Sequence, residues 1–205
     1  MSEDLEVLGN RTISGGEYNN IDVLGELRCE GRLEANDIDI MGKASFYDNV
    51  LASDVNIMGK CYIEGNLKAK EINIMGEAKI QGNVESDEIE IYGKVEVTGD
   101  INADEIEIYS AQSNFNNIYG EEVVIGAKVN KKHHRFEKIN VSQDNRLGCN
   151  INEIEATNIT LAYAKVKRVS GENIVIEENV EVDLVEYSHS LEVSKYARIK
   201  KIVKF

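Results

Sequence analysis

The sequence predicts an all-β fold: a single-stranded parallel β-helix with a triangular cross-section and about 17 residues per coil. Two observations predict it. Glycines recur at a fixed interval, and apolar residues keep the same interval over more than five repeats, which indicates stacked units rather than a compact layered domain. The first glycine series, with a spacing of 17, is Gly25, Gly42, Gly59, Gly76 and Gly93, and the second is Gly31, Gly65, Gly82 and Gly99, with Asp48 in its second place.

Each repeat divides into three short strands. Apolar residues come in pairs two apart, such as Ile72 with Ile74 and then Ala78 with Ile80. A spacing of two places both side chains on one face of a strand. Successive pairs begin at offsets of 6, 6 and 5, which gives three strands and three corners in every repeat. A helix is excluded because pairs separated by gaps of four do not share one face at 3.6 residues per turn.

Along the chain, residues 1–14 are expected to form a separate N-terminal segment and residues 15–205 a stack of about 11 coils. At about 4.8 Å per coil, the stack is roughly 50 Å long. The strict period ends near Ile125, and an irregular basic bulge is predicted at 129–138. The repeat then resumes less strictly: Phe136 and Val141 precede Ile154 and Ile159 at an offset of 18, and the pairs Ile174–Leu191, Ile176–Val193, Val182–Ile199 and Val185–Ile202 are again 17 apart.

The corners combine glycine with apolar or polar residues. In Met41-Gly42-Lys43 and Met58-Gly59-Lys60, glycine is expected to supply a positive φ. The methionines of this corner, including Met75, are expected to pack at the corner rather than to act in redox chemistry. An outward column of acidic and amide residues is expected to form a structural hydrogen-bond ladder; it comprises Asp22, Asp39, Asn56, Asn73, Glu90 and Glu107.

Composition excludes several functions. The net charge of −14 disfavours nucleic acid as a partner, because such binding needs a basic surface. No apolar run approaches the length of about 18 residues that a membrane-spanning helix needs. The acidic N-terminus does not resemble a secretory signal. Three cysteines without a CxxC spacing favour a reducing cytoplasm over a disulfide framework or a zinc site.

No catalytic, cofactor-binding or metal site is predicted. The strongest candidate for chemistry is the cluster His133, His134 and Arg135, which is interpreted as an exposed bulge and a partner-binding site. Adjacent histidines on a strand point to opposite faces and therefore make a poor metal site. The sequence contains no phosphate-binding loop, no GxSxG and no HExxH. Paired carboxylates are plentiful, but a regular rod offers them no cleft.

The two ends of the stack are the predicted polymer interface. An open β-helix end exposes unpaired strand edges and an apolar cross-section, which must be capped or matched to another end. The last coil stays apolar and in register to the final residue, and no polar cap follows it. The predicted interface residues are Leu5, Val7 and Ile13 at the N-terminal end and Leu191, Val193, Ile199, Ile202 and Phe205 at the C-terminal end.

The repeat that runs from Val55 to Ala69 (VNIMGKCYIEGNLKA) resembles the coil of the bactofilins, bacterial polymer-forming cytoskeletal proteins. The resemblance covers residues 15–125 well and the rest loosely. It implies a right-handed β-helix that polymerises end to end without nucleotide or cofactor. It also implies a non-enzymatic cytoplasmic scaffold that associates with itself, with a related paralogue and with membrane or cell-envelope proteins.

Two other functions remain open from the sequence. A hexapeptide-repeat acyltransferase also has triangular coils, with a histidine such as His133 or His134 as its base; its coils run 6+6+6, whereas these run 6+6+5. A β-helical module that binds another protein on an outer face is the second alternative.

Overall fold

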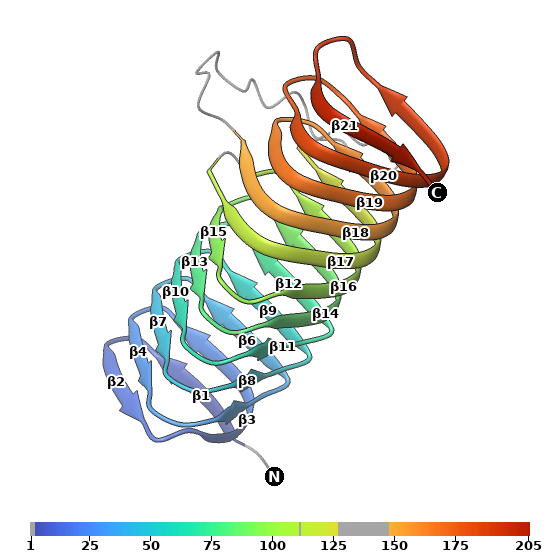
Figure 1. Cartoon of the computed structure of the whole chain (residues 1–205). Coiled ribbons are helices and arrows are strands. Elements are labelled where there is room, and N and C mark those ends of the chain that lie inside the picture. The colour runs from blue at the N-terminus through green and yellow to red at the C-terminus, as the bar shows by residue number, and fades with distance from the viewer. Residues whose placement is uncertain (1–2, 111, 127–147) are drawn as a thin grey trace, which may run out of the picture.

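The computed structural model describes residues 3–110, 112–126 and 148–205 of the chain. These residues form 21 β-strands and no helix, and all strands pair in parallel within one continuous sheet. Figure 1 shows the result, a rod of stacked coils with the two termini at opposite ends. The predicted β-helix is therefore confirmed. Since the described residues contain no helix, they contain none that could cross a membrane.

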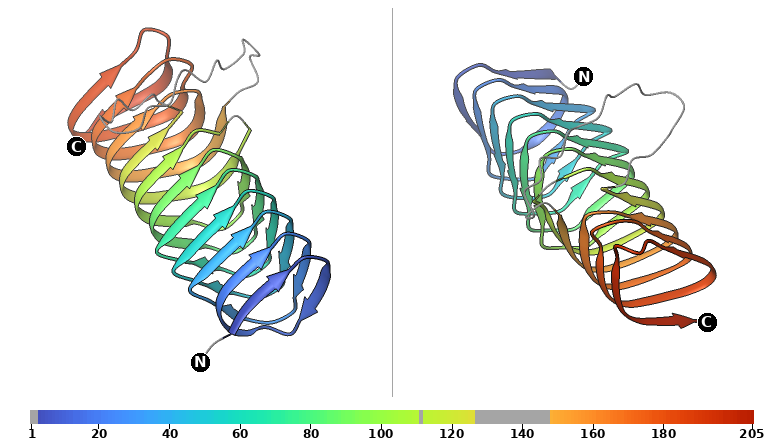
Figure 2. Two further views of the ribbon diagram at one scale, coloured as in Figure 1. Left: turned by 180° about the vertical axis from the view of Figure 1, so that it is seen from behind. Right: turned by 90° about the horizontal axis from the view of Figure 1, so that it is seen from above.

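Three sides run along the rod, as the two further views in Figure 2 also show. Side one carries one strand per coil, eleven in all among the described residues, in agreement with the predicted number of coils. It is built by β1 (Glu3–Val7), the end of β3 (Gly16–Val23), β6 (Asp37–Ile40), β9 (Asp54–Ile57), β12 (Glu71–Ile74) and the ends of the longer strands β14 (Val84–Ile91), β16 (Ile101–Ile108), β17 (Asn114–Ile125), β18 (Cys149–Leu161), β19 (Ala164–Ile176) and β20 (Glu181–Val193).

Sides two and three follow the same scheme. Side two is built by β2 (Asn10–Ile13), β4 (Glu26–Cys29), β7 (Lys43–Phe46), β10 (Lys60–Ile63), β13 (Glu77–Ile80), β15 (Lys94–Val97) and the starts of β17 to β20 and of β21 (Arg198–Lys204). Side three is built by the start of β3, by β5 (Leu33–Glu34), β8 (Val50–Leu51) and β11 (Leu67–Lys68), and by the remaining parts of the longer strands.

The core is the file of side chains inside the three sides. Its members come from the apolar columns predicted from the sequence, and nearly all are less than a tenth exposed. Ser86 replaces alanine in one column, and its hydroxyl donates to the carbonyl oxygens of Lys70 (2.7 Å) and Glu88 (2.9 Å). The polar atom is thereby satisfied, so the column tolerates it.

The corner glycines between sides one and two act differently from the prediction. Among the described glycines, positive φ values occur at Gly15, Gly16 and Gly126, not at Gly42 or Gly59. A Cβ on Gly59 would lie 2.0 Å from the carbonyl oxygen of Gly42 in the coil below. Glycine is required here because the backbones of successive coils pass too close for any side chain.

The period of 17 holds from β3 to β16 and changes afterwards. Phe115 pairs with Val97, which is an offset of 18. The buried Ser113 hydroxyl accepts a hydrogen bond from the Val95 backbone N–H at 2.8 Å. Beyond the second gap in the description, Ile159 pairs with Ile174 at an offset of 15. Val166 then pairs with Val182 at an offset of 16, and the offset returns to 17 after a register shift between Gly171 and Asn173. Ile154 and Ile159 pair directly with Ile118 and Val123, so no coil lies between β17 and β18. Phe136 and Val141 lie outside the described residues.

The first residues belong to the stack. Residues 3–7 and 10–13 form β1 and β2, which pair in parallel with β3 and β4. The coil pattern therefore begins at Glu3 within the described part of the chain, ahead of the expected start at residue 15.

Candidate assembly surfaces at the ends of the stack

The N-terminal end exposes little of its core-facing apolar side chains. Leu5 and Val7 in β1 are each only 2% exposed, although they belong to the first coil. Ile13 in β2 is half-buried, and both it and Tyr18 pack against the core. The three predicted interface residues at this end therefore offer little apolar surface.

The C-terminal end is open. In the last coil Phe205 is 70% exposed, Ile202 50% and Val193 45%, whereas Leu191 and Ile199 pack partly against the core. These five residues are the ones predicted from the sequence for this end, and β20 and β21 bring them together on the last turn. Tyr196, which the sequence analysis did not single out, adds a further exposed ring (64%).

The backbone at this end is open as well. β21 pairs with β20 on one edge, and no strand of the described residues pairs with its other edge. A row of unpaired backbone donors and acceptors beside exposed apolar side chains is a template for another strand. The C-terminal end therefore carries both the hydrogen-bonding groups and the apolar surface that a further coil would cover.

Charged side chains surround the open end. Lys200 lies 2.7 Å from Asp183 and holds the pKa of that carboxyl below its usual range. Arg198 pairs with Glu181 at 2.9 Å, and Lys204 lies over the Tyr187 ring at 5.4 Å. An apolar centre with a charged rim is the usual anatomy of a protein–protein interface.

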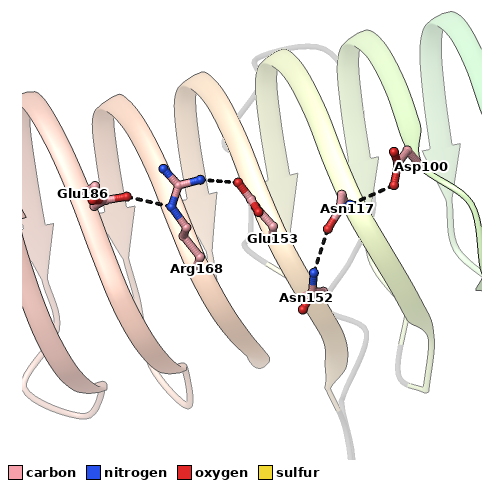
Figure 3. A network of polar contacts seen from close by, with 6 residues as sticks. All are labelled: Asp100, Asn117, Asn152, Glu153, Arg168 and Glu186. Atoms are coloured by element: carbon pink, nitrogen blue, oxygen red, sulfur yellow. Dashed lines mark hydrogen bonds and ion pairs between the residues drawn. The ribbon is translucent and has the colours of Figure 1, made fainter.

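A polar network ties five consecutive coils together on the outer surface (Figure 3). The Arg168 guanidinium bridges Glu153 of the previous coil and Glu186 of the next, with Nε 2.7 Å from the Glu186 carboxylate. Further along, Asn152 donates to the Asn117 side-chain oxygen (2.8 Å).

The Asn117 amide in turn donates to Asp100 (2.9 Å). The network thus spans β17 and β18, between which the chain has its long connection. Sequence reasoning missed it because its members are 15, 17, 18 and 35 residues apart rather than in one column. It contains no nucleophile or general base beside a cleft, and its role is to hold coils together.

The predicted bulge residues His133, His134 and Arg135 lie outside the described residues. Within the part of the chain that is described, no group of three or more histidine, cysteine or acidic side chains is arranged to hold a metal ion. Cys29, Cys61 and Cys149 are buried free thiols, and burial raises the pKa of Cys61 and of Cys149 to about 12. These thiols are therefore protonated at neutral pH and poor nucleophiles.

Comparison with known proteins identifies a family. A family model described as "Bactofilin: Polymer-forming cytoskeletal" matches residues 6–114 and 48–133, two overlapping matches that together span more than half of the chain. No curated protein and no solved structure matches the chain.

Proposed function

Because this chain belongs to the bactofilin family of polymer-forming cytoskeletal proteins, we propose that it is a non-enzymatic bacterial scaffold that polymerises end to end through its terminal coils without nucleotide. Its place of action is the cytoplasm, as a cytoskeletal element associated with the membrane. Its principal partner is itself; a related paralogue and membrane or cell-envelope proteins are further partners of the proposed scaffold.

The observation that carries the proposal is the open last coil. Phe205, Ile202 and Val193 leave apolar surface exposed beside the unpaired edge of β21. Stacking another coil there would bury this surface and satisfy the backbone groups, with the geometry that already repeats along the rod. Since coil stacking uses only side chains and backbone of the chain, no nucleotide is required to drive it.

The test is negative-stain electron microscopy of the pure protein without nucleotide, beside sedimentation velocity. The wild-type chain is expected to form elongated assemblies many coils long. Phe205→Arg places a charge in the apolar contact and is expected to block end association while the fold, followed by circular dichroism, persists.

Val203→Arg is the matched control. It is matched to a second disrupting variant, Ile202→Arg: Ile202 pairs with the buried Val185, whereas Val203 pairs with Glu186 on the outer surface, so the Val203 side chain points away from the core cross-section. Val203→Arg should still assemble. A monodisperse wild-type monomer at high concentration, or unchanged assembly of Phe205→Arg, would count against the proposal.

A further inference from the structure

An exposed apolar ridge runs along the corner between sides one and two, far from the open end. Each of the first six coils contributes one residue, and each of these side chains is between 44% and 69% exposed. With successive coils about 4.8 Å apart, the ridge extends for roughly 24 Å. A continuous exposed apolar row of this kind marks an interaction surface. The ridge consists of Leu8, Leu24, Met41, Met58, Met75 and Tyr92.

A shallow groove lies beside the ridge. Met58, Met75 and Tyr92 line one wall, and Lys60, Glu77 and Lys94 line the other. Gly59, Gly76 and Gly93 lie between them, at positions where a Cβ would lie 2.0 Å or less from a backbone oxygen of the coil below. The groove therefore cannot be filled by side chains of its own coil, and it runs parallel to the ridge.

The two flanks of the ridge and groove differ in charge. The outward residue two positions before the ridge is acidic or an amide in every coil, and the one two positions after it is a lysine in three of the six. The acidic flank is Glu6, Asp22, Asp39, Asn56, Asn73 and Glu90; the mixed flank is Asn10, Glu26, Lys43, Lys60, Glu77 and Lys94.

We propose that the ridge is a lateral interface for a second copy of this chain, lying parallel to the first and related to it by a two-fold axis along the rod. This symmetry places the ridge of each copy in the groove of the other. It also places the acidic flank of each copy beside the mixed flank of its partner, so that Asp39 meets the partner's Lys43 and Glu90 meets the partner's Lys94.

The other arrangements are less favourable. In an antiparallel pair, each flank faces the same flank of the other copy, so Asp22 would face the partner's Glu90. Only one groove could then receive a ridge, because the groove lies to one side of it. An anionic membrane would be pressed against the acidic flank, which repels it. The parallel pair gives reciprocal packing together with two contacts between opposite charges, Asp39 with Lys43 and Glu90 with Lys94, against one between like charges, Asp22 with Glu26.

The first experiment separates this contact from end association by using the Phe205→Arg background. Sedimentation equilibrium is expected to show a residual dimer. Adding Met58→Glu, which buries one carboxylate from each copy, should weaken this dimer about 100-fold or more. The control Gln81→Glu adds the same charge at an exposed corner between sides two and three and should leave the dimer unchanged.

The second experiment reads the register. Met41→Cys, Met58→Cys and Met75→Cys are each treated with a short bismaleimide, to which the three buried native thiols are inaccessible. In the parallel pair every variant cross-links to its own copy. In an antiparallel pair only the position nearest the axis would do so, and Met41→Cys would cross-link to Met75→Cys instead. Gln81→Cys is the control and should remain uncross-linked.

Three results would overturn the proposal: a strictly monomeric Phe205→Arg protein with no ridge cross-links, equal effects of Met58→Glu and Gln81→Glu, or ridge-dependent flotation with anionic vesicles without any self-pairing. The lateral contact does not depend on end association. If Phe205→Arg assembles like the wild type, the end-to-end proposal fails while the cross-linking pattern still decides the ridge.

Discussion

Gly42 stacks on Gly25 so closely that a β-carbon on Gly42 would lie 2.1 Å from the Gly25 carbonyl oxygen. The same relationship recurs at Gly59, Gly76 and Gly93, each above the glycine of the previous coil. The column is therefore a consequence of coil stacking, and each glycine is needed by the coil below it as well as by its own. The period in the sequence records this steric requirement.

A side chain in the glycine column is expected to destabilise the fold. Gly59→Ala is expected to destabilise the fold by about 2–4 kcal/mol, because the methyl group forces two backbones apart in a packed stack. Gly9→Ala is the matched control, since a Cβ there meets nothing within 4 Å. Urea unfolding followed by circular dichroism measures both. Equal stability of the two variants would contradict the steric account.

The Arg168 bridge is expected to secure the C-terminal coils. Arg168→Ala should cost about 1 kcal/mol, a modest figure because the guanidinium side chain is 40% exposed and its ion pairs are partly screened. Hydrogen exchange should accelerate in β18, β19 and β20, which the bridge joins. Arg198→Ala, which removes a pair from a side chain that is 83% exposed, should have a smaller effect. Arg168→Lys should rescue only partly, because an ammonium lacks the planar fork that reaches both carboxylates.

The Asp37 carboxyl is expected to make the stability of the fold depend on pH. Asp37 pairs with Asp54 of the next coil on side one. Burial and, after it, the neighbouring Asp54 carboxyl raise the pKa of Asp37. A carboxyl whose pKa is higher in the folded state favours folding at acid pH, and this contribution is lost as the pH rises through the folded pKa. Asp37→Asn should therefore raise the midpoint of thermal unfolding by about 1–3 °C at pH 7.

The gain should vanish at about pH 3, below the unfolded pKa of an aspartate, where the wild-type carboxyl is also protonated. Differential scanning calorimetry at the two pH values tests this. Glu64→Gln neutralises an exposed carboxylate at another corner and serves as the comparison. A gain from Asp37→Asn that persists unchanged in acid would show that the stabilisation has another cause.

The long connection between β17 and β18 is expected to be dispensable for the stack. Asn114 to Ile125 pair directly with residues of β18, so the two strands hold each other without residues 129–138. Replacing 129–138 with a short Gly/Ser linker should leave the unfolding midpoint and end association unchanged. A large drop in stability would contradict the prediction that the connection is dispensable. If His133, His134 and Arg135 bind a partner, the same variant should lose that partner in a pull-down.

The sequence predicted the regular part of the fold in detail because each coil repeats the same requirements. Ile72, Ile74 and their equivalents from Ile38 to Ile125 could be assigned to the core from spacing alone, and all are buried. The predicted reason for the corner glycines, a positive φ, was wrong. A close approach of two backbones and a positive φ both require glycine, so the sequence alone does not distinguish them. Met41, Met58 and Met75 were expected to pack at the corner, but about half of each side chain is exposed.

Other features were not predictable from the repeat. The offset of 15 between β18 and β19 and the Arg168 bridge depend on which strands pair across the irregular region. At the ends, the apolar pattern predicted both terminal coils as interface. The structure distinguishes them: Leu5 is buried, whereas Phe205 is exposed. The spacing of apolar residues is the same at both ends, so it cannot reveal this difference in burial.

The strands lie across the long axis, so the hydrogen bonds between coils run along it. A pull on the two ends therefore stretches these bonds at every level in series, and the least-paired level gives way first. On side two, β15 and β17 share only two paired positions, Glu96 with Asn114 and Val97 with Phe115, whereas β13 and β15 share four. That level keeps seven further pairs between β16 and β17, so the least-paired level among the described coils is the one between β20 and β21, with six pairs. The tensile strength of the rod is therefore set at its last coil rather than by its average coil.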